Sequence, residues 1–360
     1  VPPWFLGITW PFPFQRIGVN FLREMPHALL ADVPGLGKSL QTIAALEDHE
    51  GRILVICPNS LKFSWGNEIL KWKPGADVVI IDGTKAERER KWRAAQICKY
   101  VIINYEQLLC DFDIISKFCN ETHGFYAIIC DEATRISNSA TKTTKALKRL
   151  QAQKRIALTG TPISNSPLDC FGIINWISPR YLGSYYQFTE EYCVKEPRFN
   201  RIVGYRNLTD LGNRVSRFML RRTKEEVLPD LPPKTIQNIE FELSLPEQKL
   251  YKSIKLLILS EIMKLEINKH TLPLIPVKML RLLQVVSDPR LLGVQDIKSS
   301  KLEVLKDLLE PIIASDEKII LFTKFAEMAK ILMKELAEHD PLLIAGEVSA
   351  KDRQKAVDLF

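Results

Sequence analysis

Five residues near the amino terminus have the types and spacing needed to hold the phosphates of a nucleotide. They are Gly35, Leu36, Gly37, Lys38 and Ser39, with a helix-like stretch from Leu40 to Leu46 behind them. Glycines let backbone amides point at phosphate oxygens, a lysine supplies a mobile cation, and a serine at a helix start can ligate magnesium. The strict phosphate-loop pattern wants glycine where Asp32 stands, so a chance glycine turn is the alternative interpretation.

Two adjacent carboxylates, Asp131 and Glu132, follow the apolar run Tyr126 to Cys130. A carboxylate at the end of a buried strand beside a phosphate loop is placed to hold magnesium, which predicts Asp131 and Ser39 as metal ligands. Glu132 is then predicted to orient and deprotonate the attacking water. These two acids and Lys38 form the predicted catalytic set. For a lone Asp-Glu pair, the alternative is a solvated helix cap.

A third polar group, Thr159, Gly160 and Thr161, ends the apolar run at 156–158. Small polar residues at the carboxyl end of a strand can sense a γ-phosphate across a crevice, so these three are predicted to couple nucleotide state to motion. A plain turn from strand to loop is the alternative.

Short apolar runs that do not alternate in polarity recur through the first half of the chain, at 53–56, 78–81, 100–103, 126–130 and 156–158. Strands buried on both faces have this pattern, and they belong to parallel sheets covered by helices. Helical spacing over 61–73 and 141–150 completes a β-α alternation. The sequence therefore predicts an α/β fold with a parallel sheet.

Beyond Pro162 the pattern predicts a mostly helical, basic elaboration from about residue 163, within a first domain that spans 1–235. Helices are expected over 245–269 and 277–286, which makes 236–299 a helical linker or protrusion. Helices over 301–309 and 326–336 flank the apolar run 319–322, so 300–360 is the expected start of a second α/β domain. About 60 residues are too few to complete such a domain.

Composition narrows the class of protein. The 360 residues are 46% hydrophobic and 26% charged, which is ordinary for a globular protein. No apolar stretch reaches the length of a membrane helix and no leader precedes Val1, so we expect an intracellular protein that uses no membrane. The seven cysteines form no C-x-x-C pair, and reduced core thiols are expected.

The net charge of +7 is concentrated in one segment, because 195–224 holds nine basic residues against two acidic ones. Clustered lysines and arginines are the electrostatic footprint of nucleic-acid binding. Arg198, Arg201 and Arg206 are therefore predicted to contact nucleic-acid phosphates. A solvated basic face is the alternative.

Taken together, the motifs resemble those of the SNF2 family of double-stranded DNA translocases in helicase superfamily 2. Residues 13–22 resemble its glutamine motif and 31–41 its phosphate-loop block. Residues 56–61, with Trp65, Glu68 and Trp72, resemble its motif Ia. Further matches are 104–106, 159–162 with Asn165, 218–224, 231–234, 287–292 and 320–325. The resemblance covers nearly the whole chain.

The resemblance implies a RecA-like lobe that binds ATP and Mg²⁺, followed by part of a second RecA-like lobe, acting on double-stranded or branched DNA. Gln15 is implied to read adenine, and Leu40 is included in the nucleotide-binding set. The other implied DNA contacts are Asn59, Ser60, Lys62, Arg221, Arg222, Thr323 and Lys324. The compact spacing of the motifs and the Phe14-Gln15 pair are more similar to those of the HARP-type annealing-helicase branch than to those of chromatin remodellers.

Some positions depart from the family pattern. Pro34 replaces the usual methionine, Ser39 a threonine and Thr134 a histidine. The chain reaches Phe360 before motifs V and VI, which carry arginines directed at the γ-phosphate, so we expect a fragment with weak ATP turnover. Two other functions stay open at this point: a strand-separating DNA or RNA helicase, and a nucleic-acid-binding module that uses ATP as a switch without hydrolysing it effectively.

Overall fold

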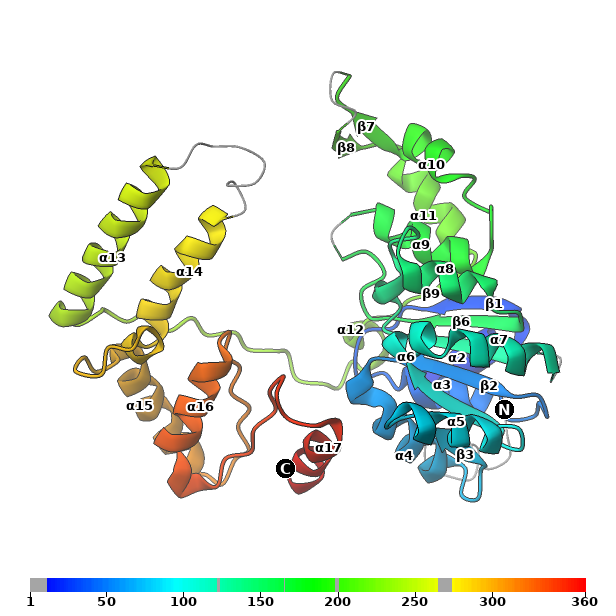
Figure 1. Ribbon diagram of the computed structural model, residues 1–360, viewed down its shortest axis with the longest axis horizontal. Helices are drawn as coiled ribbons and strands as arrows, with labels where there is room; N and C mark the ends of the chain where they lie inside the picture. Colours follow the sequence, from blue (N-terminus) through cyan, green and yellow to red (C-terminus); the bar gives the residue numbers. More distant parts are fainter. Residues whose placement is uncertain (1–11, 122–123, 165, 198–200, 265–273) are drawn as a thin grey trace. The chain divides into compact units, whose positions relative to one another are not determined.

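Seven parallel strands form the central sheet of the first unit of the chain, Val1–Pro232, in the order β3-β4-β2-β5-β6-β1-β9 (Figure 1). The computed structural model describes residues 12–121, 124–164, 166–197, 201–264 and 274–360. The strands are β1 (His27–Leu30), β2 (Ile53–Cys57), β3 (Val78–Ile80), β4 (Tyr100–Asn104), β5 (Phe125–Asp131), β6 (Ala152–Leu158) and β9 (Met219–Leu220). The predicted α/β fold with a parallel sheet is confirmed.

Both faces of this sheet are buried at its centre, which explains why β2 is apolar at every position. Along β2, Ile53 and Val55 enter one core, whereas Leu54 and Ile56 enter the core on the other face. Successive side chains of a strand point to opposite faces, so a strand covered on both sides needs apolar residues throughout.

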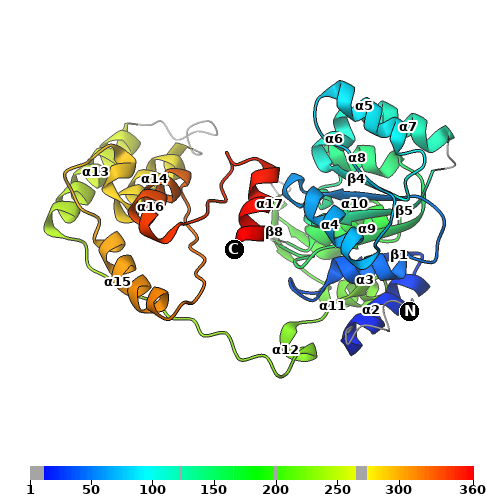
Figure 2. The same ribbon diagram turned by 90° about the horizontal axis from the view of Figure 1, so that it is seen from below.

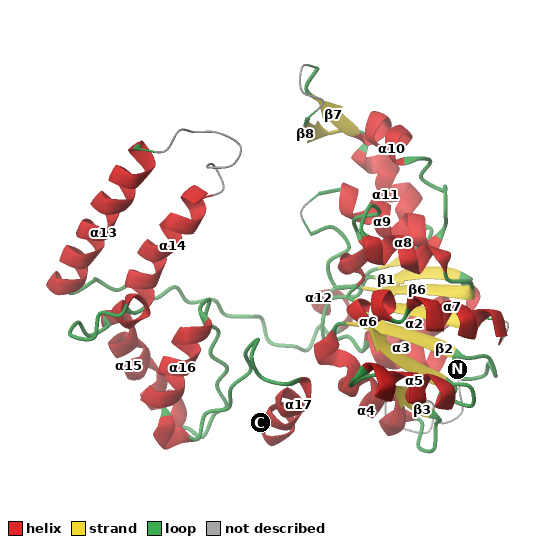
Figure 3. Ribbon diagram, viewed as in Figure 1, coloured by secondary structure: helices red, strands yellow, loops and turns green. Residues whose placement is uncertain are grey.

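Helices cover the two faces of the sheet as separate layers (Figure 3). One layer is α2 (Pro13–Glu24), α3 (Lys38–Ala45) and α4 (Lys62–Trp72), which supply Val19, Leu40 and Trp65 to their core. The other core takes side chains from α5 (Lys85–Ala94), α6 (Tyr105–Cys110), α7 (Phe112–Glu121), α8 (Lys142–Arg149), α9 (Leu168–Ile177), α10 (Tyr185–Tyr192) and α11 (Leu208–Ser216). Short 3-10 turns η1 (Asn59–Leu61) and η2 (Ala133–Ile136) follow β2 and β5, and α12 (Lys224–Val227) follows β9.

The region after Pro162 is mostly helical, as expected, but it also contains three strands that the sequence did not indicate. Strands β7 (Cys193–Lys195) and β8 (Ile202–Tyr205) form an antiparallel hairpin that projects beyond α10 (Figure 1). Strand β9 returns to the main sheet beside β1. A two-residue strand and a half-exposed hairpin are too short and too polar to produce a periodic apolar signal.

The second unit, Pro233–Phe360, contains α13 (Leu245–Met263), α14 (Leu274–Ser287), η3 (Pro289–Leu292), α15 (Ser300–Ala314), α16 (Ala326–Glu335), η4 (Ala337–His339) and α17 (Ala350–Leu359). Helices α13 and α14 lie side by side in both views (Figures 1 and 2). A small core of Leu302, Met328 and Leu332 joins α15 to α16. The further division of this unit at residue 299 stays a prediction.

One helix expected in the second unit is confirmed only as far as the described residues reach, and one expected strand is absent from them. Helix α13 ends at Met263, and residues 265–269 of the predicted helix lie outside the described residues. The run 319–322 is not a strand in the described part of the chain, and Phe322 is 94% exposed. A single apolar run cannot form a ladder without a neighbouring strand to satisfy its backbone groups.

Among the described residues, no helix is both long and apolar enough to cross a membrane.

Two helical glycines provide a matched test of the packing around α9. A Cβ on Gly172 would lie 1.8 Å from the Ser137 carbonyl oxygen, whereas a Cβ on Gly212 in α11 meets nothing within 4 Å. Gly172→Ala is expected to lower the free energy of unfolding by about 1–3 kcal/mol through overpacking. Gly212→Ala should raise it by about 0.5–1 kcal/mol because alanine favours the helix. Urea denaturation measures both, and equal stability of the two variants would contradict the described packing.

Candidate nucleotide-binding site

A glycine loop connects β1 to α3 at the carboxyl edge of the sheet. Gly35 and Gly37 have φ of 92° and 74°, values that side-chain-bearing residues rarely adopt. Gly37 is the N-cap of α3, so Lys38 and Ser39 occupy the first turn of that helix. Lys38 Nζ donates a hydrogen bond of 2.8 Å to the Asp32 carbonyl, within the loop itself. The loop therefore has the local conformation of a helix-terminal anion site.

The carboxylate pair stands at the end of β5, where the sheet holds it firmly. Asp131 is 9% exposed and accepts hydrogen bonds from Trp65 Nε1 at 2.8 Å and from the Glu132 amide at 2.9 Å. The Tyr105 hydroxyl donates to the Asp131 carbonyl at 2.7 Å, which fixes the strand end. Glu132 is exposed and has a φ of 49°, the left-handed region that costs a non-glycine residue free energy.

The two predicted parts of the site lie within electrostatic reach of each other. Burial lowers the pKa of Lys38, and the charges of Asp131 and Glu132 oppose that shift. Burial also raises the pKa of Asp131 and of Glu132, and the Lys38 cation counteracts both shifts. The buried Asp131 and the half-buried Lys38 therefore have limited access to bulk water, and the exposed Glu132 adds its charge beside them. An added phosphate and metal would find strong interactions there.

The chemistry of these residues fits a magnesium ion bound together with a nucleotide. Among the described residues no group of three or more His, Cys, Asp or Glu side chains could hold a metal alone. Mg²⁺ commonly uses one or two protein ligands together with substrate phosphates and water. Asp131 and Ser39 stay the predicted metal ligands, and their side-chain oxygens are of the kind that such a site would use.

Gln15, the predicted adenine reader, is bound to the phosphate loop. It is 1% exposed, and its Nε2 donates to the Leu36 carbonyl at 3.2 Å. Gln41 of α3 donates to the same carbonyl at 2.9 Å. Leu36 thus links the helix that carries Gln15 to the loop that carries Lys38.

Asp32, the residue that breaks the strict pattern, is completely buried and paired with Arg222. Arg222 Nε donates to Asp32 Oδ1 at 3.0 Å, and its Nη2 donates to Gln41 Oε1 at 2.9 Å. The guanidinium also donates to the Phe14 carbonyl. Asp32 is therefore an anchor for the loop, and its carboxylate needs a buried cation.

The group after β6 packs against the same loop. Thr159 is fully buried, and its Oγ1 accepts a hydrogen bond of 3.1 Å from the Thr161 amide. A Cβ on Gly160 would lie 2.8 Å from Pro34 Cδ. Pro34 therefore packs directly on the backbone at Gly160.

The structure overturns two of the predicted DNA contacts. Arg222 is 8% exposed, and its donors are taken by Asp32, Gln41 and Phe14. Lys62 is 3% exposed, and its Nζ donates to the Ile81 carbonyl at 3.3 Å inside the unit. Neither cation is presented to a nucleic acid, so both assignments are withdrawn.

The other predicted DNA contacts in the described residues are exposed and stay predictions: Asn59, Ser60, Arg201, Arg206, Arg221, Thr323 and Lys324. Asn59 and Ser60 follow β2 at the carboxyl edge of the sheet, and Asn59 Oδ1 accepts a 2.9 Å hydrogen bond from Asn104. Arg206 donates to backbone carbonyls at the end of α10, which holds the base of the hairpin. Arg198 and Asn165 lie outside the described residues.

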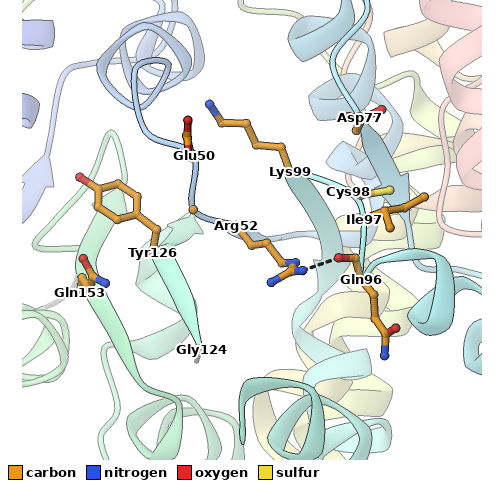
Figure 4. A pocket seen from close by; sticks show the side chains of 11 residues that line it. Glu50, Arg52, Asp77, Gln96, Ile97, Cys98, Lys99, Gly124, Tyr126 and Gln153 are labelled. Atoms are coloured by element: carbon orange, nitrogen blue, oxygen red, sulfur yellow. Dashed lines mark hydrogen bonds between the residues drawn. The ribbon is translucent and has the colours of Figure 1, made fainter. Parts of the chain in front are cut away.

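A pocket of about 530 Å³ opens at the opposite, amino-terminal edge of the sheet (Figure 4). Its lining mixes acidic and basic side chains, Glu50 and Asp77 with Arg52 and Lys99. Arg52 donates to the Gln96 carbonyl, so this cation is already bound within the pocket wall. Since ligands of parallel sheets bind at the carboxyl ends of the strands, we assign this pocket no part in the nucleotide site.

Sequence reasoning missed the role of Asp32 and of its partner. The signal that could have found it was an acidic residue in a loop expected to be buried, since a buried carboxylate requires a cation nearby. Trp65 and Tyr105 were recognised only within matching motifs, and no sequence pattern indicated that they bind Asp131.

A parallel sheet with a phosphate loop after its first strand and an acidic pair at the end of another defines a RecA-like nucleotide-binding lobe. Residues 14–291 match the model of the SNF2-related domain. The chain belongs to this family of helicase-like ATPases. The HARP-type branch stays a prediction.

Several characterised and uncharacterised proteins are similar to this chain. An uncharacterized ATP-dependent helicase of Mycoplasma genitalium is 29% identical over 96% of this chain and 34% of its own length. DNA repair and recombination protein RAD54B of Mus musculus is 33% identical over 64% of this chain and 28% of its own. The chain thus spans about a third of the length of these relatives.

A solved structure is similar over nearly the whole chain. The SWI2/SNF2 ATPase core of Sulfolobus solfataricus in complex with double-stranded DNA is 29% identical, with a TM-score of 0.54. The similarity covers 97% of this chain and 75% of that chain.

The buried carboxylate of Asp131 predicts a conflict between stability and metal binding. Its raised pKa means that the folded state favours the protonated form, so stability from this group is lost as pH rises through the folded pKa. We expect Asp131→Asn to have a higher Tm than the unsubstituted protein at mildly alkaline pH, with a smaller difference at acidic pH. Calorimetry across that range measures it, and an equal Tm at both ends would contradict the prediction. Magnesium-dependent nucleotide binding should be lost in the same variant.

Proposed function

We propose that this chain forms the ATP-binding part of a motor that couples hydrolysis of Mg-bound ATP to movement along double-stranded DNA. The observation that carries the proposal is the electrostatic proximity of Lys38 to Asp131 and Glu132, at the carboxyl edge of the sheet. Phosphoryl transfer needs mainly positioning and charge stabilisation, and these residues supply both. Membership of the SNF2-related family supports the ATPase assignment.

Each residue has a definable task in this mechanism. Lys38 leaves the Asp32 carbonyl to bind the terminal phosphates, while the loop amides bind the others. Asp131 and Ser39 would hold a magnesium ion, which would neutralise phosphate charge when bound. Glu132 accepts the proton of the attacking water, and its raised pKa makes it a better base than an ordinary carboxylate.

Duplex DNA is the proposed track. The Sulfolobus core, which this chain resembles, was solved with double-stranded DNA. We propose branched DNA as a more specific substrate. Because duplex and branched DNA are both intracellular substrates, the proposal also places the protein inside the cell. The product distinguishes this activity from that of a strand-separating helicase. A helicase converts a simple duplex into single strands, whereas a translocase leaves it intact.

Replacing the proposed base tests hydrolysis in the full-length protein. Glu132→Gln should keep Mg-ATP bound and slow DNA-stimulated phosphate release by about 10²- to 10⁴-fold, the range for a lost general base. Lys38→Ala serves as comparison because it should lose nucleotide binding as well. Phosphate release at saturating ATP, with and without duplex DNA, measures both. An unchanged rate of phosphate release in Glu132→Gln would identify Glu132 as a helix cap and contradict the proposed mechanism.

The basic segment 195–224 predicts that DNA binding depends on the salt concentration. Replacing Arg198, Arg201 and Arg206 with Ser should weaken binding to unrelated duplex sequences alike. Each lost phosphate contact should reduce the slope of log K against log salt by about 0.9. Fluorescence anisotropy at several salt concentrations gives the slope. The same slope in the variant and the unsubstituted protein would identify the segment as a solvated surface.

A further inference from the structure

The segment after β9 runs along the phosphate loop. The Ala31 amide donates to the Leu220 carbonyl at 2.7 Å, and the Val33 amide donates to the Arg222 carbonyl at 3.1 Å. The backbone of this segment therefore continues the pairing of β9 with β1 into the loop. Residues far apart in the sequence are held next to the nucleotide site by these bonds.

Successive side chains of this segment reach different parts of that site. Arg222 enters the interior and pairs with Asp32, as described above. Arg221 is exposed, and its Nη1 donates to the Gly160 carbonyl at 3.4 Å. Lys224 begins α12, which Thr223 caps by accepting a hydrogen bond from the Glu226 amide. The position of Lys224 is thus set from both sides, by the buried pair and by the helix cap.

The side chain of Lys224 lies close to the exposed Gly35 of the phosphate loop. A Cβ built on Gly35 would lie 3.2 Å from Lys224 Cε and 3.3 Å from its Nζ. The residue is exposed, and among the described residues no carboxylate pairs with its ammonium group. An unpaired cation therefore lies against a glycine of the loop, and the absence of a side chain at residue 35 leaves it room.

The charge balance of the site leaves a role for a second cation. Lys38 faces two carboxylates, Asp131 and Glu132, while the charge of Arg222 is neutralised by Asp32. A nucleotide brings further negative charge that one lysine and one magnesium ion do not fully offset. The side chain of Lys224 is flexible, so its ammonium group can bind phosphate oxygens as a point charge from its position next to Gly35.

We propose that Lys224 is a second phosphate-binding residue of the nucleotide site, supplied by the same unit from the end of the helical elaboration. The inference rests on the proposed function. It assigns this lysine to the nucleotide's phosphates instead of to DNA or solvent.

The test compares nucleotides that differ in phosphate number, by calorimetric titration of the 360-residue chain with ADP and with AMP in the presence of Mg²⁺. A hydrogen bond to a charged group contributes about 1.5 kcal/mol at its lower limit, so Lys224→Gln should weaken ADP binding by about 10-fold. AMP affinity should change little. Lys224→Arg should keep the preference for ADP over AMP because it retains the cation.

Lys85→Gln is the matched control, since Lys85 is an exposed lysine at the start of α5 and belongs to no part of the site. It should leave both affinities unchanged. An unchanged ADP preference in Lys224→Gln would overturn the inference, and a reduced salt slope for duplex DNA in that variant would reassign the lysine to DNA. Equal weakening of ADP and AMP would also overturn it, because it would indicate a distorted loop. Failure of the unsubstituted chain to bind either nucleotide would instead overturn the proposed function.

Discussion

The ion pair between Asp32 and Arg222 is the interaction on which the nucleotide site depends. Both groups are buried, and a buried charge is tolerated only when its partner is close and its other hydrogen bonds are satisfied. Asp32 holds the loop to the end of β9, while Arg222 also binds Gln41 and the Phe14 carbonyl. Removing one partner would leave the other charge uncompensated, so the loop, α2 and α3 are stabilised as one assembly.

The sheet could be predicted from the sequence because burial on both faces leaves a local record. Strands such as β2 are apolar at every position, and each lies where a short apolar run indicated it. The hairpin of β7 and β8, the two-residue β9 and the run 319–322 could not be assigned in this way. Whether those segments become strands depends on partners that are distant in the chain, which no local pattern encodes.

For the candidate site too, the sequence could predict some residues and not others. Lys38, Asp131 and Glu132 could be predicted as site residues because the proposed chemistry requires fixed residue types next to glycines or after a buried strand. The two misassigned residues, Lys62 and Arg222, are cations in segments where family resemblance implied DNA contact. Only the fold reveals that their charges are directed inward, since sequence gives the sign of a charge but not the direction of its side chain.

The conformation of Glu132 has an evolutionary consequence. This residue keeps a left-handed backbone that glycine would adopt without strain, and it stands beside a desolvated carboxylate and a desolvated lysine. Each of these features lowers the stability of the folded chain for the benefit of the site. If selection acted only on the stability of the fold, Glu132, Asp131 and Lys38 would therefore be among the first residues to be replaced. Descendants that had ceased to use a nucleotide would be recognisable by glycine, asparagine or an apolar residue at these positions.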